Sequence, residues 1–584
     1  MGLASATLRA RRSRYRLTIS PAILAGRRKR WRVAPPPNYS AVKQLSHLPA
    51  IVAALLARRG IATPDEARRF LDVDETLFED PFTLPDAGRA VLRLTRARRE
   101  GELVAVYGDF DADGVTGTAL LTKALRRYGL NVVPYIPHRV TEGHGLNARA
   151  LDALALKGVR LVVTVDCGVT DVAPVAHAMR LGMDVIITDH HTVNGPLPGA
   201  SAVINPRAPG STYGFDHLTG VGMALKLSQA LLGDGHGAGW DKGLLELAAI
   251  GTVTDMAPVL GENRYIVHHG LRHLRETESV GLRTLMQLAR VQLQHANAET
   301  IGFAIGPRLN AAGRLDSAGT ALDLLLTADA EHALELAASL EGHNGQRQKL
   351  TEDTMNRCRE QVLARPTVPP LLIVGSRDFN PGVVGLAAGK LAEEFGVPAV
   401  VYALDGNKVM ASCRSGPGFH WARALAMCGE LLERHGGHAQ AAGFTCEASR
   451  LDELRDRLDA IAGEWMGERP AADESVVDAE VDLPQVMGRT FQVLQRMGPF
   501  GMGNPAPLFL TRGMQVDGVS TMGADARHFR MRLRAGGAQW DAVAFRQAWV
   551  PGTERADIVY SLDVDTWGGS PRLRVNIQDF APAS

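Results

Sequence analysis

At 584 residues the chain is too long for one hydrophobic core, and its length predicts three or four domains. Its 45% apolar and 22% charged residues are an ordinary globular balance, and its net charge of +1 excludes a chain that is basic throughout. Five scattered cysteines without a CxxC pair exclude a disulfide framework and a structural zinc site, and no apolar run of about 18 residues predicts a membrane-spanning helix.

The start of the chain differs from the rest in charge. Residues 1–40 contain many arginines and no Asp or Glu. A basic start without acidic residues can mimic an organelle transit peptide. We expect instead a disordered basic tail over residues 1–45.

Short apolar runs alternate with amphipathic stretches between Leu103 and Ile204. The strands are predicted at Leu103–Tyr107, Val132–Ile136, Leu161–Val165 and Val185–Thr188, and the helices at Thr118–Tyr128, Ala148–Lys157 and Val172–Leu181. This alternation favours a doubly wound parallel sheet. Three of the four strands are followed by an acidic motif, which reads GDFDADG, DCG or DHH. Loops beyond the carboxyl ends of such strands converge, so we expect these motifs to meet in one crevice.

The rest of the chain predicts three further regions. A helix-rich segment extends to about Arg365 and includes Ala328–Glu360, which we expect to form one bridging helix. Strands predicted at Leu371–Val374, Ala399–Tyr402 and Val409–Cys413 indicate a second α/β domain. Short alternating runs after Val476, such as Phe529–Leu533 and Leu573–Ile577, favour a small β-barrel. The expected domains are therefore 46–265 (catalytic α/β), 266–365 (helical linker), 366–465 (second α/β) and 475–584 (barrel).

The acidic motifs carry the candidate chemistry. Asp109, Asp111 and Asp113 are two residues apart, so on an extended strand end their carboxylates would face one point. For this motif alone we would favour an acidic turn or a helix cap. Asp166 and the Asp-His-His run at 189–191, both at equivalent strand ends, change that interpretation, and Asp255 also follows an apolar run. Clustered carboxylates repel unless cations neutralise them. Carboxylates with imidazole suit Mn²⁺ or Mg²⁺, and two such ions can activate water against a phosphodiester.

The motif order GDFDADG, VDCG, TDHH and GTVTDMAP resembles the DHH phosphoesterase family. The resemblance implies metal ligands at Asp111, Asp113, Asp166, His190 and Asp255, with Asp109 as a further one, and it places His191 against the substrate phosphate. Small-molecule branches of the family carry a histidine four residues before the Asp-x-Asp pair. Tyr107 stands there in this chain, and GDFDADG is the form found in the RecJ exonuclease branch.

The resemblance extends over about Leu48 to Phe580. The sequences ASCRSG and GGHAQAAGF resemble a companion (DHHA1) domain, and GPFGMGNPAPLF resembles the entry to an OB-type barrel. We expect Ser412, Arg414 and His438 in glycine-flanked loops that hold phosphate. The same resemblance implies substrate contacts at Arg139, Arg308, Asn310 and Arg314. Where RecJ relatives carry Trp-His, this chain has Phe379-Asn380. The resemblance therefore implies no role at this position for the histidine that the relatives carry.

These features lead to an expected activity, which is 5′→3′ hydrolysis of single-stranded DNA to mononucleotides with two Mn²⁺ or Mg²⁺ ions. Arg139, Ser412 and Arg414 would anchor the 5′ phosphate. The resemblance implies a cytoplasmic monomer in recombination and repair, beside single-strand-binding protein and a RecQ-type helicase. One alternative is a nucleotide phosphatase or oligoribonuclease, but such an enzyme needs no strand-binding barrel. The other is an inactive strand-binding scaffold, but a scaffold needs no intact carboxylates at the metal positions.

Overall fold

The computed structural model describes residues 30–139, 141–233, 242–415, 418–466, 474–522, 528–535, 537–545, 547, 553–565 and 572–583. The chain divides into two compact units. One contains Met1–Ala62, Glu468–Gln492 and Pro507–Ser584, and the other contains Thr63–Gly467 and Val493–Ala506. In the described part of the chain we find no helix with the length and apolar character needed to cross a membrane.

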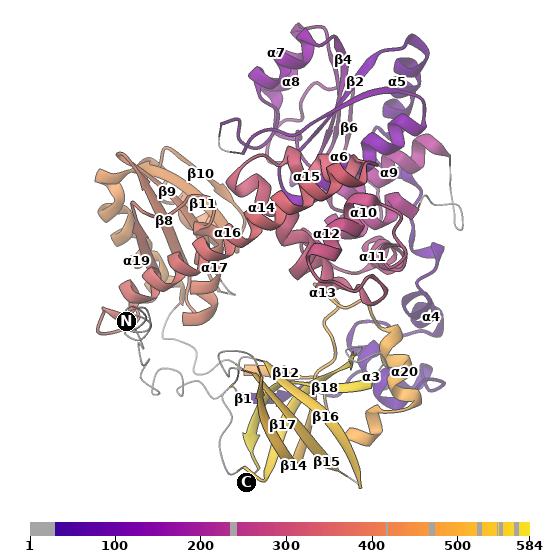
Figure 1. Cartoon of the computed structure of the whole chain (residues 1–584), viewed down its shortest axis with the longest axis vertical. Coiled ribbons are helices and arrows are strands. Elements are labelled where there is room, and N and C mark those ends of the chain that lie inside the picture. The colour runs from indigo at the N-terminus through magenta and orange to yellow at the C-terminus, as the bar shows by residue number, and fades with distance from the viewer. Residues whose placement is uncertain are drawn as a thin grey trace, which may run out of the picture. The chain divides into compact units, whose positions relative to one another are not determined.

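The larger unit contains a parallel five-stranded sheet (Figure 1). Its strand order is β3 (Asn131–Tyr135), β2 (Leu103–Gly108), β4 (Val159–Val165), β5 (Asp184–Thr188) and β6 (Ala202–Ile204). One face packs on α5 (Ala87–Glu100), α6 (Ala112–Arg127) and α9 (Gly220–Leu232), and the other on α7 (Ala148–Leu156) and α8 (Val172–Arg180). The predicted doubly wound sheet is therefore confirmed, and helices on both faces explain why its strands are continuous apolar runs.

A set of helices continues the core of this sheet. They are α10 (Lys242–Thr254), α11 (Gly261–Leu274), α12 (Val280–Leu288), α13 (Ala298–Thr300), α14 (Gly306–Leu315) and α15 (Gly319–Leu326), and α4 (Pro64–Asp72) precedes the sheet. Leu245, Leu285 and Leu324 belong to the same buried cluster as Val163 on β4. The segment after residue 265 is thus part of the first core rather than a separate linker.

The predicted bridging helix is α16 (Ala330–Leu363), which runs for 34 residues. Ala333 and Leu340 in its first half pack into the core of the first sheet. Met355 and Cys358 in its second half pack into the core of the next domain. One continuous helix therefore joins two cores, and its two halves pack against different partners.

The second domain is built on a mixed sheet with helices on both faces. Its order is β10 (Arg434–Gly437), β11 (Ala441–Glu447), β9 (Lys408–Arg414), β8 (Ala399–Asp405) and β7 (Leu372–Ser376). β7 and β8 are parallel, and the other pairs are antiparallel. α16 and α17 (Val384–Phe395) share the core of one face, and α18 (Trp421–Ala426) and α19 (Leu451–Met466) that of the other.

The smaller unit contains a closed barrel. Its strands are β14 (Phe509–Met522), β15 (His528–Ala535), β16 (Ala538–Phe545), β18 (Arg572–Pro582) and β17 (Arg555–Asp565), and pairing between β17 and β14 closes the circuit. The short β13 (Ala479–Glu480) pairs in parallel with the start of β14. Closure leaves no free edge along these strands, which is how an OB-type barrel protects its backbone groups. The predicted barrel is confirmed.

Part of the expected basic tail is structured. Residues 1–29 lie outside the described residues, but β1 (Arg30–Val33) pairs in parallel with β12 (Glu474–Val477). Trp31 Nε1 donates a 2.8 Å hydrogen bond to Asp579 on β18, and α2 (Tyr39–Gln44) and α3 (Ala50–Arg58) follow. The expectation of disorder up to residue 45 was wrong from Arg30 onward, because strand pairing and a partly buried indole contact outweigh the basic composition.

Arg264 on α11 ties a distant segment of the chain to the larger unit. Its side chain is 1% exposed and stacks on Phe70, with its guanidinium carbon 3.9 Å from the ring centroid. The guanidinium donates hydrogen bonds to the carbonyl oxygens of Phe70 (3.0 Å), Arg496 (3.1 Å), Gly498 (2.7 Å) and Pro499 (3.4 Å). The end of α20 (Arg489–Arg496) and the turn after it are therefore held by one buried cation.

We expect Arg264→Met to destabilise the protein by several kcal/mol. A buried carbonyl left without its donor costs about 1–3 kcal/mol, and this substitution removes the donor of several. The free energy of unfolding in urea is the measurement. Arg272→Met on the exposed side of the same helix is the control and should change stability little. Equal stability of the two variants would show that water replaces the guanidinium.

Candidate active site

The candidate site lies where the strand order of the parallel sheet reverses. The connection from β2 leads to β3 on one side, whereas β4, β5 and β6 follow on the other. Asp109 follows β2, Asp166 follows β4, and Asp189 follows β5, so three acidic positions meet at one edge. Ligands in open α/β sheets bind outside the carboxyl ends of strands at such a reversal.

The GDFDADG motif forms a strand-to-helix turn. We expected its carboxylates to face one point from an extended strand, and that interpretation was wrong because β2 ends before the first of them and α6 begins at Ala112. Asp111 caps the helix, since its Oδ1 accepts the backbone N–H groups of Asp113 (2.9 Å) and Gly114 (3.1 Å). Asp113 accepts the N–H groups of Gly220 (2.6 Å) and Val221 (2.9 Å) at the start of α9. Helix ends therefore orient both carboxylates.

One glycine is required by how closely α9 approaches the site. A Cβ atom at Gly220 would lie 2.3 Å from the Cβ of Asp166 and 2.7 Å from its Oδ1. Asp166 itself has a φ of 65°, a left-handed conformation that a non-glycine residue rarely adopts. Backbone strain of this kind concentrates at functional sites, and here the surrounding helix and strands hold it in place.

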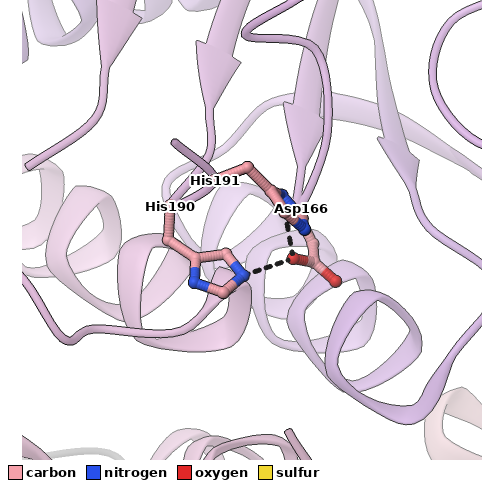
Figure 2. Close-up of side chains that lie close together, drawn as sticks. All are labelled: Asp166, His190 and His191. Carbon is pink, nitrogen blue, oxygen red and sulfur yellow. Dashed lines mark ion pairs between the residues drawn. The ribbon is translucent and has the colours of Figure 1, made fainter. Parts of the chain in front are cut away.

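The six expected ligands form two groups of three. Within each group, ligand atoms lie within 4.8 Å of one another, and the groups are Asp109, Asp111 and Asp166, and Asp113, His190 and Asp255. Asp166 Oδ1 lies 3.0 Å from His190 Nε2, so it connects the two groups. Asp166 also forms a third group with His190 and His191, as Figure 2 shows. The arrangement matches two adjacent cation positions that share Asp166.

The electrostatics of these residues favour the binding of cations. Burial, and then the neighbouring carboxylates, raise the pKa of Asp111, Asp113 and Asp166, and burial followed by Asp111 raises the pKa of Asp255 to about 7. In the described residues no Lys or Arg forms an ion pair with any of them. Asp109 Oδ1 and Asp166 Oδ1 are buried, and each lies 3.0 Å from an imidazole nitrogen, of His144 and His190 respectively. Hard divalent cations fit these oxygens and would remove the repulsion.

The Asp-His-His run separates the roles of its two imidazoles. Asp189 accepts the N–H groups of Val169, His190 and His191, and its Oδ1 also lies 2.7 Å from His191 Nδ1. Although burial opposes it, this pairing lowers the pKa of Asp189 to about 2 and raises that of His191. Burial and the charge of His191 lower the pKa of His190 to about 3. The lowered pKa keeps the His190 imidazole neutral, as a metal ligand must be, whereas the pairing with Asp189 favours the protonated form of His191.

Four arginines converge beside the carboxylates. They are Arg139 after β3, Arg314 on α14, Arg347 on α16 and Arg414 on β9. Burial, followed by the charges of the other three, lowers the pKa of Arg314 to about 10. In the described part of the chain none of the four forms an ion pair, and Arg139 instead lies over the Phe110 ring at 5.0 Å. Unpaired guanidinium groups gathered in this way favour an anion such as phosphate.

Three family models match the chain in order. They are the DHH family N-terminal domain at residues 103–252, the DHHA1 domain at 369–464 and the RecJ OB domain at 477–579. The chain is 37% identical to the single-stranded-DNA-specific exonuclease RecJ of Bacillus subtilis over 562 residues, which cover 94% of this chain and 71% of the relative. The namesake of Escherichia coli is 32% identical, with 92% and 96% covered. The chain belongs to the RecJ family.

Solved RecJ structures agree with this assignment. RecJ of Thermus thermophilus in complex with Mn²⁺ matches with a TM-score of 0.81 and 29% identity, over 95% of this chain and 80% of that one. The same protein in complex with Mg²⁺ matches with a TM-score of 0.74. The metal-dependent chemistry and the Mn²⁺ or Mg²⁺ cofactor expected from the sequence are thus supported by RecJ relatives that hold these ions.

The structure also explains why a tyrosine precedes the Asp-x-Asp pair in this RecJ-family chain. The buried Tyr107 hydroxyl donates to the carbonyl oxygen of Gly145 and accepts from Asn147, both at 3.0 Å. It thereby anchors the loop that carries His144. His144 Nδ1 lies 3.0 Å from Asp109 Oδ1, and this contact raises the pKa of His144 to about 9. Sequence reasoning missed His144, because no periodicity or motif marks a histidine in a loop.

Two residues expected to contact the substrate contact other groups of the protein instead. Arg308 forms a two-pronged ion pair with Glu341 on α16, at 2.5 and 3.2 Å, so its charge is already neutralised. Asn310 Oδ1 accepts the backbone N–H of Ala112 at 2.9 Å, which positions the Asp-x-Asp turn from behind. Arg347, which sequence reasoning missed, stands with the unpaired arginines instead. Its guanidinium is oriented by Asn344 at 2.9 Å.

The remaining expected contacts lie on the second domain. Ser412 and Arg414 are on strand β9, and only His438 lies in a turn, between β10 and β11. The expectation that all three sit in glycine-flanked loops was therefore wrong. The pattern of KVMASCR alternates buried and partly exposed residues, which is the signature of a strand with one open face. Two residues apart, Ser412 and Arg414 share that face.

Proposed function

We propose that this RecJ-family chain is a single-stranded-DNA-specific exonuclease that hydrolyses DNA from its 5′ end and releases 5′-mononucleotides. The observation that carries the proposal is the pair of three-residue ligand groups joined at Asp166, in a chain whose relatives are named single-stranded-DNA-specific exonucleases. Two bound divalent ions would activate a water molecule and neutralise the oxygens of the phosphoryl group.

The side chains of the protein divide the remaining tasks. Asp109, Asp111, Asp113, Asp166, His190 and Asp255 hold the ions. His191, oriented by Asp189, donates to a phosphate oxygen where negative charge develops. Arg139, Arg414 and Ser412 anchor the terminal 5′ phosphate, with Arg314 and His438 beside them. Anchoring at one end explains both the polarity and the release of single nucleotides.

The proposed domains enclose the regions that the family models match. We assign residues 46–265 to the DHH catalytic domain, 266–365 to the helical segment that continues its core, 366–465 to the DHHA1 domain and 475–584 to the strand-binding OB region. By compactness, residues 46–62 belong to the unit that contains the barrel, and residues 493–506 belong to the larger unit. The three family matches lie inside these boundaries. We further propose a cytoplasmic monomer that acts in recombination and repair beside single-strand-binding protein and a RecQ-type helicase. Co-sedimentation with these two proteins tests the partners.

Product analysis tests the proposed activity. Single strands and duplexes labelled at the 5′ or the 3′ end are incubated with Mn²⁺ or Mg²⁺, and products are resolved over time. We expect 5′-labelled single strands to release labelled mononucleotides at once, 3′-labelled strands to shorten progressively, and duplexes to persist. A phosphatase or oligoribonuclease would degrade only very short strands, and an inactive scaffold would bind without cleaving.

Arg414→Ala should selectively impair action on 5′-phosphorylated ends. Charge-assisted hydrogen bonds are worth about 1.5–3 kcal/mol, so losing this contact predicts roughly a ten- to hundredfold fall in kcat/KM. The metal ligands are untouched, so a 5′-hydroxyl strand should be affected much less. Rates on the two strands are compared for wild type and variant. Equal losses on both would place Arg414 on the general path of the backbone.

A further inference from the structure

The outer half of the second sheet carries a shallow cavity in which only Ser412 has a role proposed above. The cavity has a volume of about 410 Å³, within the range typical of small-molecule sites. Its lining comes from the start of α17, from the middle of β9, and from β10 and β11 at the edge of the sheet. The residues used below are Pro381, Val384, Met410, Ser412, Arg434, Gly436 and Gly443.

The register of three strands makes the floor of this cavity flat. Gly436 on β10 pairs with Gly443 on β11, and Gly443 pairs with Ser412 on β9. Directly paired residues point to the same face of a sheet, so two glycines lie side by side next to the serine. A Cβ atom built on Gly436 would meet nothing within 4 Å, and its backbone does not require glycine. The missing side chains therefore leave a level surface, which we call the glycine shelf (Gly436 and Gly443).

The surroundings of the glycine shelf suit a flat ring. Pro381 and Val384 form an apolar wall on one side, and Met410 stands on the floor beside the glycines. Arg434 pairs across the sheet with Thr445 and forms the outer rim, where a guanidinium can stack on a ring. Apolar walls with one or two polar groups are typical of sites that bind a planar ligand.

The inner end of the shelf adjoins the phosphate anchor. A Cβ atom on Gly385 would lie 3.3 Å from Ser412 Oγ and 3.2 Å from an Arg414 terminal nitrogen, so these two groups sit together. Neighbouring strands are about 4.8 Å apart, which puts Gly443 and Gly436 one and two spacings from Ser412. That span is comparable to the span from phosphate to base in one nucleotide.

We propose that the glycine shelf binds the nucleobase of the terminal nucleotide whose 5′ phosphate is held by Ser412 and Arg414. The inference rests on the proposed function, because it assumes that the phosphate anchor serves a DNA end. The two glycines themselves offer only stacking and van der Waals contact, and the polar side chains of Arg434, His435 and Thr445 line the cavity around them. The shelf accepts any of the four bases, as an exonuclease without sequence preference requires.

Binding of two small probes tests this subsite without cleavage. Deoxyadenosine 5′-monophosphate carries phosphate, sugar and base, and 2-deoxyribose 5-phosphate lacks the base. Stacking on a protein surface corresponds to roughly a five- to hundredfold gain in affinity per base. We therefore expect wild-type protein with Mn²⁺ to bind the nucleotide at least about fivefold more tightly by calorimetry.

A filled shelf should remove that preference. In Gly436→Val the added methyl groups occupy the space over the shelf, so the two probes should bind with nearly equal affinity. Gly463→Val is the matched control, since Gly463 lies on α19 of the same domain, its Cβ position is also open, and no unusual backbone angle is needed there. Arg434→Gln, at an exposed rim position, should reduce the preference partially. Thermal unfolding of each variant verifies that it folds.

The outcomes distinguish a failure of the glycine shelf from a failure of the proposed exonuclease activity. Equal affinity of wild type for both probes, in a protein that degrades single strands from the 5′ end, overturns the shelf and leaves the exonuclease proposal intact. A preference that survives Gly436→Val also overturns it. A wild-type protein that cleaves no single strand would instead contradict the proposed function. A preference lost in Gly436→Val and kept in Gly463→Val supports the inference.

Discussion

Asp166→Asn is expected to abolish strand cleavage while preserving the fold. Asp166 belongs to one ligand group and contacts His190 of the other, so both cation positions lose a ligand together. Asparagine keeps the size of the side chain and tolerates the left-handed φ of 65° at this position, which alanine tolerates less well. Asp166→Ala should be equally inactive but less stable. Near-normal turnover in either variant would contradict the two-metal proposal.

Metal-dependent stability provides a second measurement on the same variant. A ligand that binds only the native state at a hundred times its dissociation constant stabilises it by about 2.7 kcal/mol, so Mn²⁺ should raise the Tm of the wild type. The variant should gain much less. Without metal, it should be more stable than the wild type, because one of the repelling carboxylates is gone. Asp152→Asn, at an exposed position on α7, is the control and should respond to Mn²⁺ as the wild type does.

Removing the barrel strands is expected to weaken binding of long strands by orders of magnitude and to spare hydrolysis of very short ones. Stacking contributes about 1–3 kcal/mol per base, so losing several bases' contacts predicts this size of effect. A chain ended near Glu468 would also lose the carbonyl oxygens that Arg264 binds at Arg496 and Gly498. The truncated variant should therefore end after Ala506. The measurement compares this variant with the full chain in the binding of a long strand and of a trinucleotide.

Substitutions within the intact barrel test the same surface without truncation. Arg530 and Arg532 on β15 alternate with the buried Phe529 and Met531, so they share an exposed face. Each phosphate contact on single-stranded DNA contributes about 0.7 to the slope of log affinity against log salt. Changing both to Gln should lower that slope by about 1.4. Arg512, which is ion-paired with Glu480, is the control. The barrel does not bind the strand if the slope is unchanged and the truncated chain binds a long strand as tightly as the full chain does.

Local sequence patterns account for much of this protein. The parallel sheet, the bridging helix α16 and the barrel were all predictable, because apolar periodicity depends only on which face of each element is buried. The motifs at the ends of β2, β4 and β5 predicted a shared crevice for a similar reason. Parallel strands present their carboxyl ends to one edge whatever the rest of the chain does.

Which polar side chains face the substrate was decided by the tertiary structure. Arg308 and Arg347 look alike in sequence, but Glu341 neutralises the first and no carboxylate in the described residues reaches the second. His144 enters the site because Tyr107 anchors its loop, and the glycine shelf exists because β9, β10 and β11 pair in one register. These outcomes depend on contacts between residues far apart in the chain. The sequence determines them only through the fold, since nothing local distinguishes a paired guanidinium from an unpaired one.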